Sequence, residues 1–226
     1  MVIKMLEPEN PDNWYEEQPS QVKARPGITR RDLLIGVGGV AALMGLGCLD
    51  SAAATPVVRP PGAQNDDKLF SSCIRCEKCM EVCPHGVIYP SHIENGIIGT
   101  RTPQLRFDAG YCDWCESEGG VPLCAKACPT RAFGDPSRLN AKNTVLGKAV
   151  INTDWCLAYK LAGCRFCYDA CRYEAISLDY EGRPVVDTDK CNGCGACESV
   201  CVSLKNGSIE ENATSRAITV VPMELV

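Results

Sequence analysis

The chain has 226 residues, of which 17 are cysteine and only 14 are aromatic (Trp 3, Tyr 7, Phe 4), and its formal net charge is −5. A negative net charge without a basic stretch argues against a nucleic-acid-binding protein, whose surface must neutralise phosphates. The sequence also contains no nucleophile–base constellation, nucleotide fingerprint or open-site metal motif, so no enzyme chemistry of its own is indicated.

Residues 1–54 are predicted to be an N-terminal extension followed by a twin-arginine signal peptide. Residues 29–34, Thr-Arg-Arg-Asp-Leu-Leu, fit the signal pattern Ser/Thr-Arg-Arg-x-Phe/Leu-Leu. The apolar run at 33–47 is about 15 residues long, which is shorter than the roughly 20 residues that span a bilayer and is typical of a signal peptide. Cleavage is expected after Ala52-Ala53-Ala54; retention of the signal as a tether and lipidation of Cys48 stay open.

A proline-rich linker is expected at residues 55–70, and residues 66–72 predict a helix that leads into the first cysteine. Sixteen cysteines then fall into four groups with the spacing of [4Fe–4S] ligation. The first and fourth groups have the run C-x2-C-x2-C-x3-C of bacterial two-cluster ferredoxins, in which the fourth cysteine ligates the neighbouring cluster; the second and third are gapped variants. The predicted ligands are Cys73, Cys76, Cys79 and Cys83; Cys112, Cys115, Cys124 and Cys128; Cys156, Cys164, Cys167 and Cys171; and Cys191, Cys194, Cys197 and Cys201.

Zinc binding and disulfide formation both fit the spacing of these cysteines less well. Zinc ribbons use two C-x2-C pairs about 15–20 residues apart, without the third and fourth cysteines that follow closely in these groups. Cysteines three residues apart cannot form a disulfide without strain. Each group already has four thiols, so His85 and His92 are predicted to be ordinary surface histidines.

An internal repeat predicts the fold. A β-type run ends four residues before the first cysteine of the last three groups, at residues 105–108, 149–152 and 184–187. A short helix is expected after the fourth cysteine, followed in the third group by a strand at 175–178 and a hairpin turn at 179–182. The predicted fold class is α+β: two ferredoxin-like two-cluster modules, rich in loops, with short strands and helices. The modules form a polyferredoxin core at 71–206, and a C-terminal tail follows at 207–226.

The spacing between groups suggests how they pair. The third and fourth groups are 19 residues apart, a separation usual within a two-cluster module, which leaves the first paired with the second across 28 residues. A nested arrangement, first with fourth and second with third, stays open.

Five further residues are predicted to affect the sites. Trp114 and Trp155 adjoin ligands and are expected to shield the clusters from water. Arg172 replaces the proline that usually follows the fourth cysteine. Two alternatives stay open: its charge raises the potential of a cluster, or it points to solvent and only the backbone constraint of proline is lost. Gly193 and Gly195 are expected to let backbone amides approach the cluster sulfurs.

The twin-arginine signal, the Arg-Pro-Pro-Gly-Ala segment at 59–63, the segment Phe70–Cys76 and the order of the four group types resemble the NapG/MauM family of ferredoxin-type proteins. This resemblance implies a four-cluster electron carrier in the periplasm or on the outer face of the cytoplasmic membrane, exported by the twin-arginine translocase. It also implies a quinol-oxidising membrane partner as donor and a periplasmic reductase as acceptor, nitrate reductase in the best-known branch. The alternatives are an iron–sulfur subunit fixed in a molybdopterin oxidoreductase and a maturation or assembly factor.

Overall fold

The computed structural model describes residues 29–32, 34–40, 55–160, 163–204, 213 and 215–225. The chain divides into two compact units, residues 1–45 and residues 46–226. The cysteine groups all lie in the second unit.

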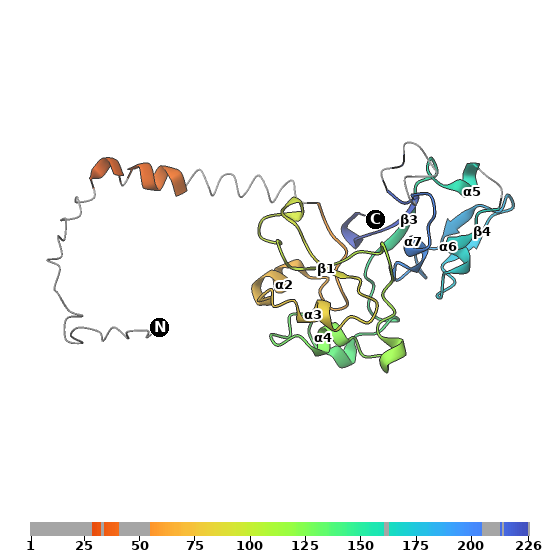
Figure 1. Cartoon of the computed structure of the whole chain (residues 1–226), viewed down its shortest axis with the longest axis horizontal. Helices are drawn as coiled ribbons and strands as arrows, with labels where there is room; N and C mark the ends of the chain where they lie inside the picture. Colours follow the sequence, from red (N-terminus) through yellow and green to blue (C-terminus); the bar gives the residue numbers. More distant parts are fainter. Residues whose placement is uncertain are drawn as a thin grey trace, which may run out of the picture. The chain divides into compact units, whose positions relative to one another are not determined.

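In the N-terminal unit, residues 30–32 and 34–40 are helical and exposed (Figure 1). The helix starts with a reciprocal cap, because Thr29 Oγ1 accepts a hydrogen bond from the Asp32 N–H at 3.3 Å and Asp32 Oδ2 accepts one from the Thr29 N–H at 2.9 Å. No helix in the described part of the chain is long and apolar enough to cross a membrane. The extension at 1–28, the predicted cleavage site and Cys48 lie outside the described residues.

The second unit consists of two halves with similar elements. The first half contains α2 (Asp66–Ser72), α3 (Lys78–Glu81), β1 (Ile88–Pro90), η1 (Ile93–Asn95), β2 (Pro103–Leu105), η2 (Glu116–Glu118), α4 (Leu123–Lys126) and η3 (Pro136–Arg138). The second half contains β3 (Lys148–Ile151), α5 (Leu157–Lys160), α6 (Phe166–Asp169), β4 (Ile176–Leu178), β5 (Pro184–Val186), α7 (Ala196–Ser199), β6 (Ile218–Val221) and η4 (Met223–Leu225).

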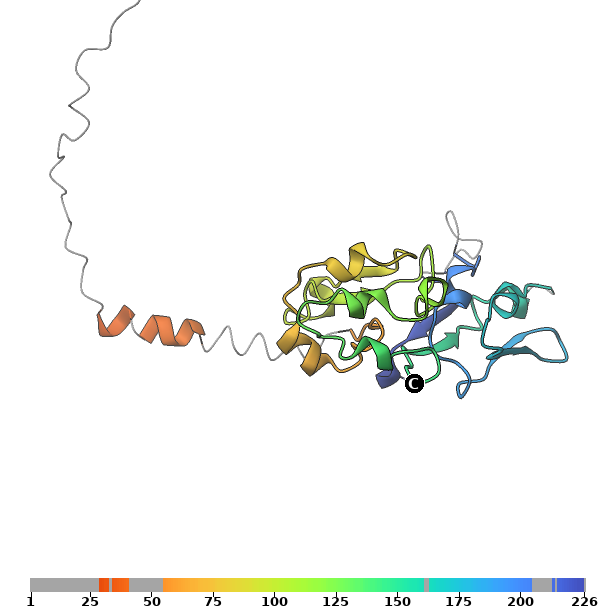
Figure 2. The same ribbon diagram turned by 90° about the horizontal axis from the view of Figure 1, so that it is seen from below.

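Three two-stranded antiparallel sheets join these elements. β1 pairs with β2 and β4 pairs with β5, each as a hairpin between two cysteine groups, and β3 pairs with β6 from the end of the chain. The two hairpins end alike, because the Arg106 N–H donates to the Val87 carbonyl at 2.9 Å and the Asp187 N–H donates to the Ala175 carbonyl at 2.7 Å. The halves therefore repeat one strand–loop–helix unit, which Figure 2 shows from a second side.

Most of the predicted secondary structure is confirmed, with one error. A strand precedes each of the last three cysteine groups, the helix at 66–72 is present, and the turn after β4 closes with a 2.9 Å hydrogen bond from the Asp179 N–H to the Arg183 carbonyl. The helix expected after each fourth cysteine is wrong. Instead, α3, α4, α6 and α7 carry the third cysteine of each group, and the chain turns after these helices so that the fourth cysteine faces the other group of its half.

The segment predicted as a linker is packed onto the first half. Val58, Pro60 and Pro61 are buried, and the Val58 carbonyl accepts a hydrogen bond from the Leu105 N–H at 2.7 Å. Arg59 is only 5% exposed and pairs with Asp66 at 2.8 Å. These residues therefore belong to the folded core.

Part of the segment predicted as a tail also belongs to the core. β6 pairs with β3 in the register Ala149↔Val220. Just before it, the Arg216 guanidinium donates hydrogen bonds to the carbonyls of Phe107 (3.0 Å) and Asp108 (2.6 Å) in the first half. The chain end thus ties the two halves together, and a boundary at residue 206 does not describe this fold.

Candidate metal centres

The sixteen predicted ligands converge on four cavities, four thiols to each. In each cavity three cysteines come from one group and one, the last of its group, comes from another. The cavities are named here by their cysteines: cavity I (Cys73, Cys76, Cys79, Cys128), cavity II (Cys83, Cys112, Cys115, Cys124), cavity III (Cys156, Cys164, Cys167, Cys201) and cavity IV (Cys171, Cys191, Cys194, Cys197). The first group thus meets the second and the third meets the fourth; none of these four cavities has the nested composition.

The backbone of each regular loop turns twice through the left-handed region. Arg75 (φ 56°) and Glu77 (φ 63°) flank the second cysteine of the first group, and Gly193 (φ 77°) and Gly195 (φ 82°) flank that of the fourth. This conformation costs a non-glycine residue about 1–2 kcal/mol, so the loop geometry is imposed even where the sequence has no glycine. The repeated strain indicates that the surrounding fold holds the loop in the conformation that positions the thiols, despite its local energetic cost.

The separation of the thiols in each cavity favours a group of several atoms over a single ion. Cavities I to IV enclose about 360, 350, 370 and 330 Å³ respectively, including space open to solvent. A zinc ion draws its four sulfurs to about 2.3 Å from one point, whereas among the described residues no three Cys, His, Asp or Glu side chains come together closely enough to hold one ion. Four thiols around such a space fit a cubane cluster.

Backbone N–H groups already point at the sulfurs. The last cysteine of the second group and that of the third each accept a hydrogen bond four residues ahead, from Ala132 N–H to Cys128 Sγ (3.3 Å) and from Ala175 N–H to Cys171 Sγ (3.2 Å). Leu123 N–H donates to Cys115 Sγ at 3.4 Å. Such donors stabilise a thiolate and are among the factors that set the potential of an iron–sulfur cluster.

Trp114 supplies a further donor in the wall of cavity II. Its side chain is 1% exposed, and its Nε1 is buried with no hydrogen-bond partner among the described residues. A buried donor without an acceptor costs about 1–3 kcal/mol, and a sulfur of a cluster held in cavity II would offer it an acceptor. Trp155, by contrast, is half-buried beside cavity III.

The thiols are poor acids without a metal. Burial, and then the neighbouring Cys73, raise the pKa of Cys79 to about 12; burial, and then Cys156, raise the pKa of Cys167 to about 12. Burial also raises the pKa of Cys194, to about 11. Positive iron must therefore stabilise the thiolates, and assembly of the sites releases protons.

Cavities within each half adjoin through their helices. α3 carries Cys79 of cavity I and packs against α4, which carries Cys124 of cavity II. α6 carries Cys167 of cavity III and packs against α7, which carries Cys197 of cavity IV. The third cysteines of each half lie close together: Cys79 raises the pKa of Cys124 and Cys167 raises the pKa of Cys197, although burial is the larger cause in both.

Cavities II and IV adjoin across the boundary between the halves. The N–H of Cys112, a ligand residue of cavity II, donates to the carbonyl of Cys194, a ligand residue of cavity IV, at 2.8 Å. Trp114 packs edge-on against Tyr173 with ring centroids 6.0 Å apart. The four cavities therefore form a continuous row in the order I, II, IV, III.

Glycines allow this close approach. A Cβ on Gly193 would lie 2.4 Å from the backbone nitrogen of Gly147, and a Cβ on Gly195 would lie 2.1 Å from the Phe107 ring. The sequence predicts that both glycines let the backbone approach the cluster. The structure shows that Gly195 is also required where the second half touches Phe107 of the first, and Gly193 where its loop packs against the segment before β3.

Arg172 neither projects freely into solvent nor stands alone beside a cavity. Its Nη2 lies 3.2 Å from Glu116 Oε2 of the first half, and its guanidinium lies over the Tyr111 ring at 6.0 Å. It is nevertheless close enough to Cys194 to lower the pKa of that thiol, although burial outweighs this effect. Its charge thus acts on cavity IV, in part compensated by Glu116.

The two histidines differ. His92 is exposed at the start of η1. His85 lines cavity II, with Nε2 3.1 Å from Asp113 Oδ2 and its ring stacked on Tyr111 at 5.2 Å. The prediction of an ordinary surface residue missed this position, although His85 follows Cys83 by two residues in the sequence.

The comparison with protein families supports iron–sulfur sites in both halves. Residues 72–133 and residues 162–203 each match the model of a 4Fe-4S dicluster domain. The first match contains the first and second cysteine groups, and the second match contains the fourth group and most of the third. No solved structure matches the chain significantly.

Curated relatives extend over most of the chain. It is 36% identical over 216 residues to the methylamine utilization ferredoxin-type protein MauM of Methylorubrum extorquens, covering 87% of this chain and 90% of that protein. It is 33% identical over 188 residues to the ferredoxin-type protein NapG of Escherichia coli, covering 76% of this chain and 79% of that protein. The chain therefore belongs to the family of MauM and NapG ferredoxin-type proteins, iron–sulfur electron carriers with two 4Fe-4S dicluster domains.

Proposed function

We propose that the protein is an exported carrier with four [4Fe–4S] clusters, which passes single electrons from a quinol-oxidising membrane protein to a periplasmic reductase. The observation that carries this proposal is the continuous row of four sulfur-lined cavities, joined at its centre by the hydrogen bond between Cys112 and Cys194. A row of one-electron sites suits transport of electrons rather than catalysis.

All sixteen predicted cysteines act as ligands in this proposal, four to each of cavities I to IV. When bound, each cluster supplies reversible one-electron chemistry. The chain supplies the thiolates, the backbone N–H groups that donate to Cys115, Cys128 and Cys171, and the buried ring of Trp114 that excludes water from cavity II.

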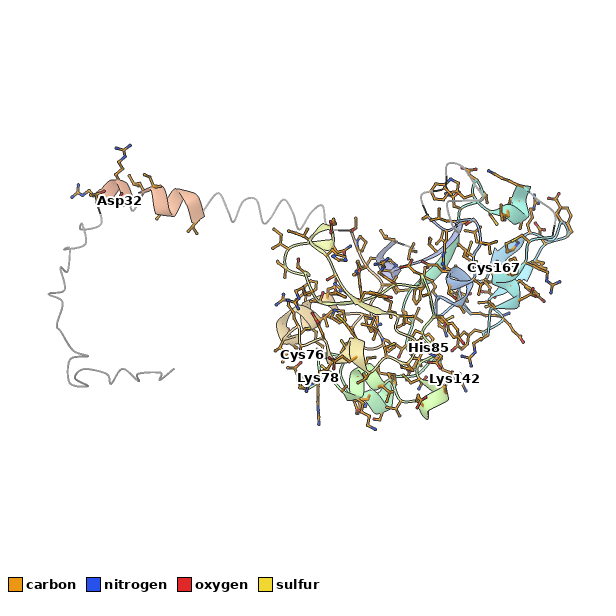
Figure 3. The ribbon with its side chains drawn as sticks, viewed as in Figure 1. Asp32, Cys76, Lys78, His85, Lys142 and Cys167 are labelled. Atoms are coloured by element: carbon orange, nitrogen blue, oxygen red, sulfur yellow. The ribbon has the colours of Figure 1, made fainter. Side chains whose placement is uncertain are left out.

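The order of the row differs from the order of the cysteine groups in the sequence. Electrons pass between the halves at cavities II and IV, so cavities I and III are the two ends. Figure 3 shows Cys76 of cavity I and Cys167 of cavity III toward opposite sides of the second unit, with His85 of cavity II between them. The ends are therefore the places at which a donor and an acceptor dock.

Export follows from the twin-arginine pattern at residues 29–34 together with the cysteine-rich fold. The free energy of cluster binding is also folding free energy, so a protein of this kind must be assembled before it crosses a membrane. We assign residues 1–54 to the extension and signal of an exported chain, and the ferredoxin-type relatives MauM and NapG support a role in electron transfer.

An anaerobic redox titration followed by EPR, with iron counted on the same sample, tests this function. About sixteen irons per chain (four atoms in each of four cavities) and potentials spread around that of the quinone pool are expected. Potentials all far below the quinone pool would make quinol a poor donor and overturn the proposed direction. Purification in a fixed stoichiometric complex with a large catalytic subunit would instead favour the oxidoreductase-subunit alternative.

A further inference from the structure

One end of the row reaches the surface. Cys76 is exposed, whereas the other fifteen ligand cysteines are buried or only partly exposed. Its neighbour Ile74 is 63% exposed. Cavity I is therefore the point in the row from which an electron has the shortest path to a molecule outside the protein.

Basic side chains surround this end. Arg75, Lys78 and Arg101 line cavity I together with one acidic residue, Glu77, which leaves a local charge of +2 (three positive, one negative). At the other end of the row, the residues that line cavity III include no charged side chain. The two ends are therefore electrostatically different.

The fold fixes part of this charge in place. The Arg75 guanidinium donates to the Thr100 carbonyl at 2.9 Å and to the Ile98 carbonyl at 2.8 Å. Both acceptors are neutral, so these two bonds hold the side chain without neutralising its charge. Arg101 pairs with Glu77. Lys78 is exposed on α3 beside Cys79, and Figure 3 shows it next to Cys76.

The same contacts add an apolar component. By holding the Ile98 and Thr100 carbonyls, Arg75 places the loop before β2 beside the Cys76 loop, and Ile98 is 61% exposed. The resulting surface consists of Ile74, Arg75, Cys76, Glu77, Lys78, Ile98 and Arg101, and we call it the Cys76 face. Small apolar contacts within a ring of one charge sign are typical of transient electron-transfer complexes, in which charge guides the encounter.

We propose that the Cys76 face is the docking surface for an acidic electron-transfer protein, an inference that rests on the proposed carrier function. Charge complementarity identifies the partner: the three basic side chains around Cys76 would pair with carboxylates on an acidic protein, whereas a basic protein would offer them no partner. An anionic membrane is the weaker match, because recognition of lipid headgroups by charge uses clusters of about 4–8 Lys or Arg residues, and this face has three.

The test uses the holoprotein and a reduced flavodoxin, a strongly acidic one-electron donor, as the probe. The rate of cluster reduction is followed by stopped-flow absorbance at low and high ionic strength. Lys78→Glu changes the charge of the Cys76 face by two units; Lys142→Glu makes the same change at an exposed lysine outside it. Ile74→Asp is a second variant of the face, with one added negative charge.

The expected result is a rate for Lys78→Glu about tenfold below wild type at low salt, a difference that disappears near 1 M salt, where charges are screened beyond about 3 Å. Ile74→Asp is expected to act in the same direction, and Lys142→Glu to stay within twofold of wild type. Equal effects of Lys78→Glu and Lys142→Glu, or a rate independent of salt, would overturn the proposal.

Two controls are needed. The first distinguishes a protein partner from a membrane, and the second distinguishes a failure of the docking surface from a failure of the carrier function. Co-sedimentation of the wild type, but not Lys78→Glu, with vesicles that contain phosphatidylserine would assign the face to a membrane and overturn the protein partner. Iron content and EPR potentials are measured on each variant. A wild type without four clusters contradicts the carrier function, whereas four clusters with no effect of Lys78→Glu contradict only the docking surface.

Discussion

Gly193→Ala tests whether cavity IV depends on the close packing of the loop that carries Cys191 and Cys194 against the segment that precedes β3. A Cβ at residue 193 would lie 2.4, 2.5 and 2.8 Å from the backbone N, O and C atoms of Gly147. Backbone atoms cannot rotate away as a side chain does, so the loop at Gly193 and the segment before β3 must move apart. Gly182→Ala is the matched control, because Gly182 has nearly the same φ (78° against 77°) and no atom lies within 4 Å of its added Cβ.

The magnitude follows from the difference between these two variants. Both carry the cost of a left-handed alanine, about 1–2 kcal/mol, and only Gly193→Ala adds overpacking, which costs about 1–3 kcal/mol. If overpacking lowers the free-energy barrier to opening of the fold by this difference, Gly193→Ala loses its clusters about 5- to 150-fold faster than Gly182→Ala.

The assay is the decay of the visible cluster absorbance in denaturant with an iron chelator, under anaerobic conditions. Gly193→Ala is expected to lose its clusters faster than Gly182→Ala by that factor. Equal decay rates for the two variants would refute the close packing of Gly193 against Gly147.

Three further predictions concern the clusters themselves. Trp114→Phe removes the indole N–H, which has no hydrogen-bond partner among the described residues. Because a donor favours the more negative reduced cluster, loss of a hydrogen bond of about 1 kcal/mol is expected to lower the potential of one cluster by about 40 mV. An unchanged set of potentials would contradict a hydrogen bond from Trp114 to a cluster sulfur. Arg172→Gln removes a positive charge near Cys194 and is expected to lower the potential of one cluster. Glu116→Gln removes the carboxylate that lies 3.2 Å from Arg172 and is expected to raise the same potential. Shifts of the same sign in both variants would rule out the charge effect. Removal of iron by a chelator should unfold the second unit, as followed by circular dichroism, because the thiol-lined cavities have no other filling; an unchanged spectrum would show that the apoprotein folds alone.

The spacing of the cysteines was the basis for most of the features that could be predicted from the sequence. Close thiols at fixed separations constrain the local loop, and the strands before Cys112, Cys156 and Cys191 followed from β-type runs that end in a turn residue. The helix before Cys73 was equally local, since Asn65 caps it by accepting the N–H of Lys68.

What sequence reasoning missed depends on contacts between distant residues. A proline-rich stretch with an arginine suggested a linker, yet Arg59 is buried because Asp66, Thr102 and the Pro103 carbonyl bind its guanidinium. β6 was missed because its partner, β3, lies about 70 residues earlier in the sequence and no local signal encodes that pairing. The proximity of cavities II and IV depends on Gly195, whose role becomes visible only when Phe107 of the first half is in place.

The order of the row is the central claim, and EPR spectra of fully reduced variants test it most directly. A variant without the cluster of cavity II (Cys115→Ala with Cys124→Ala) is compared with one without that of cavity III (Cys156→Ala with Cys164→Ala). The order I, II, IV, III predicts that loss of cluster II leaves cluster I magnetically isolated, with a sharp uncoupled signal, while loss of cluster III leaves three clusters coupled. An uncoupled signal on loss of cluster III, or none on loss of cluster II, would contradict the row.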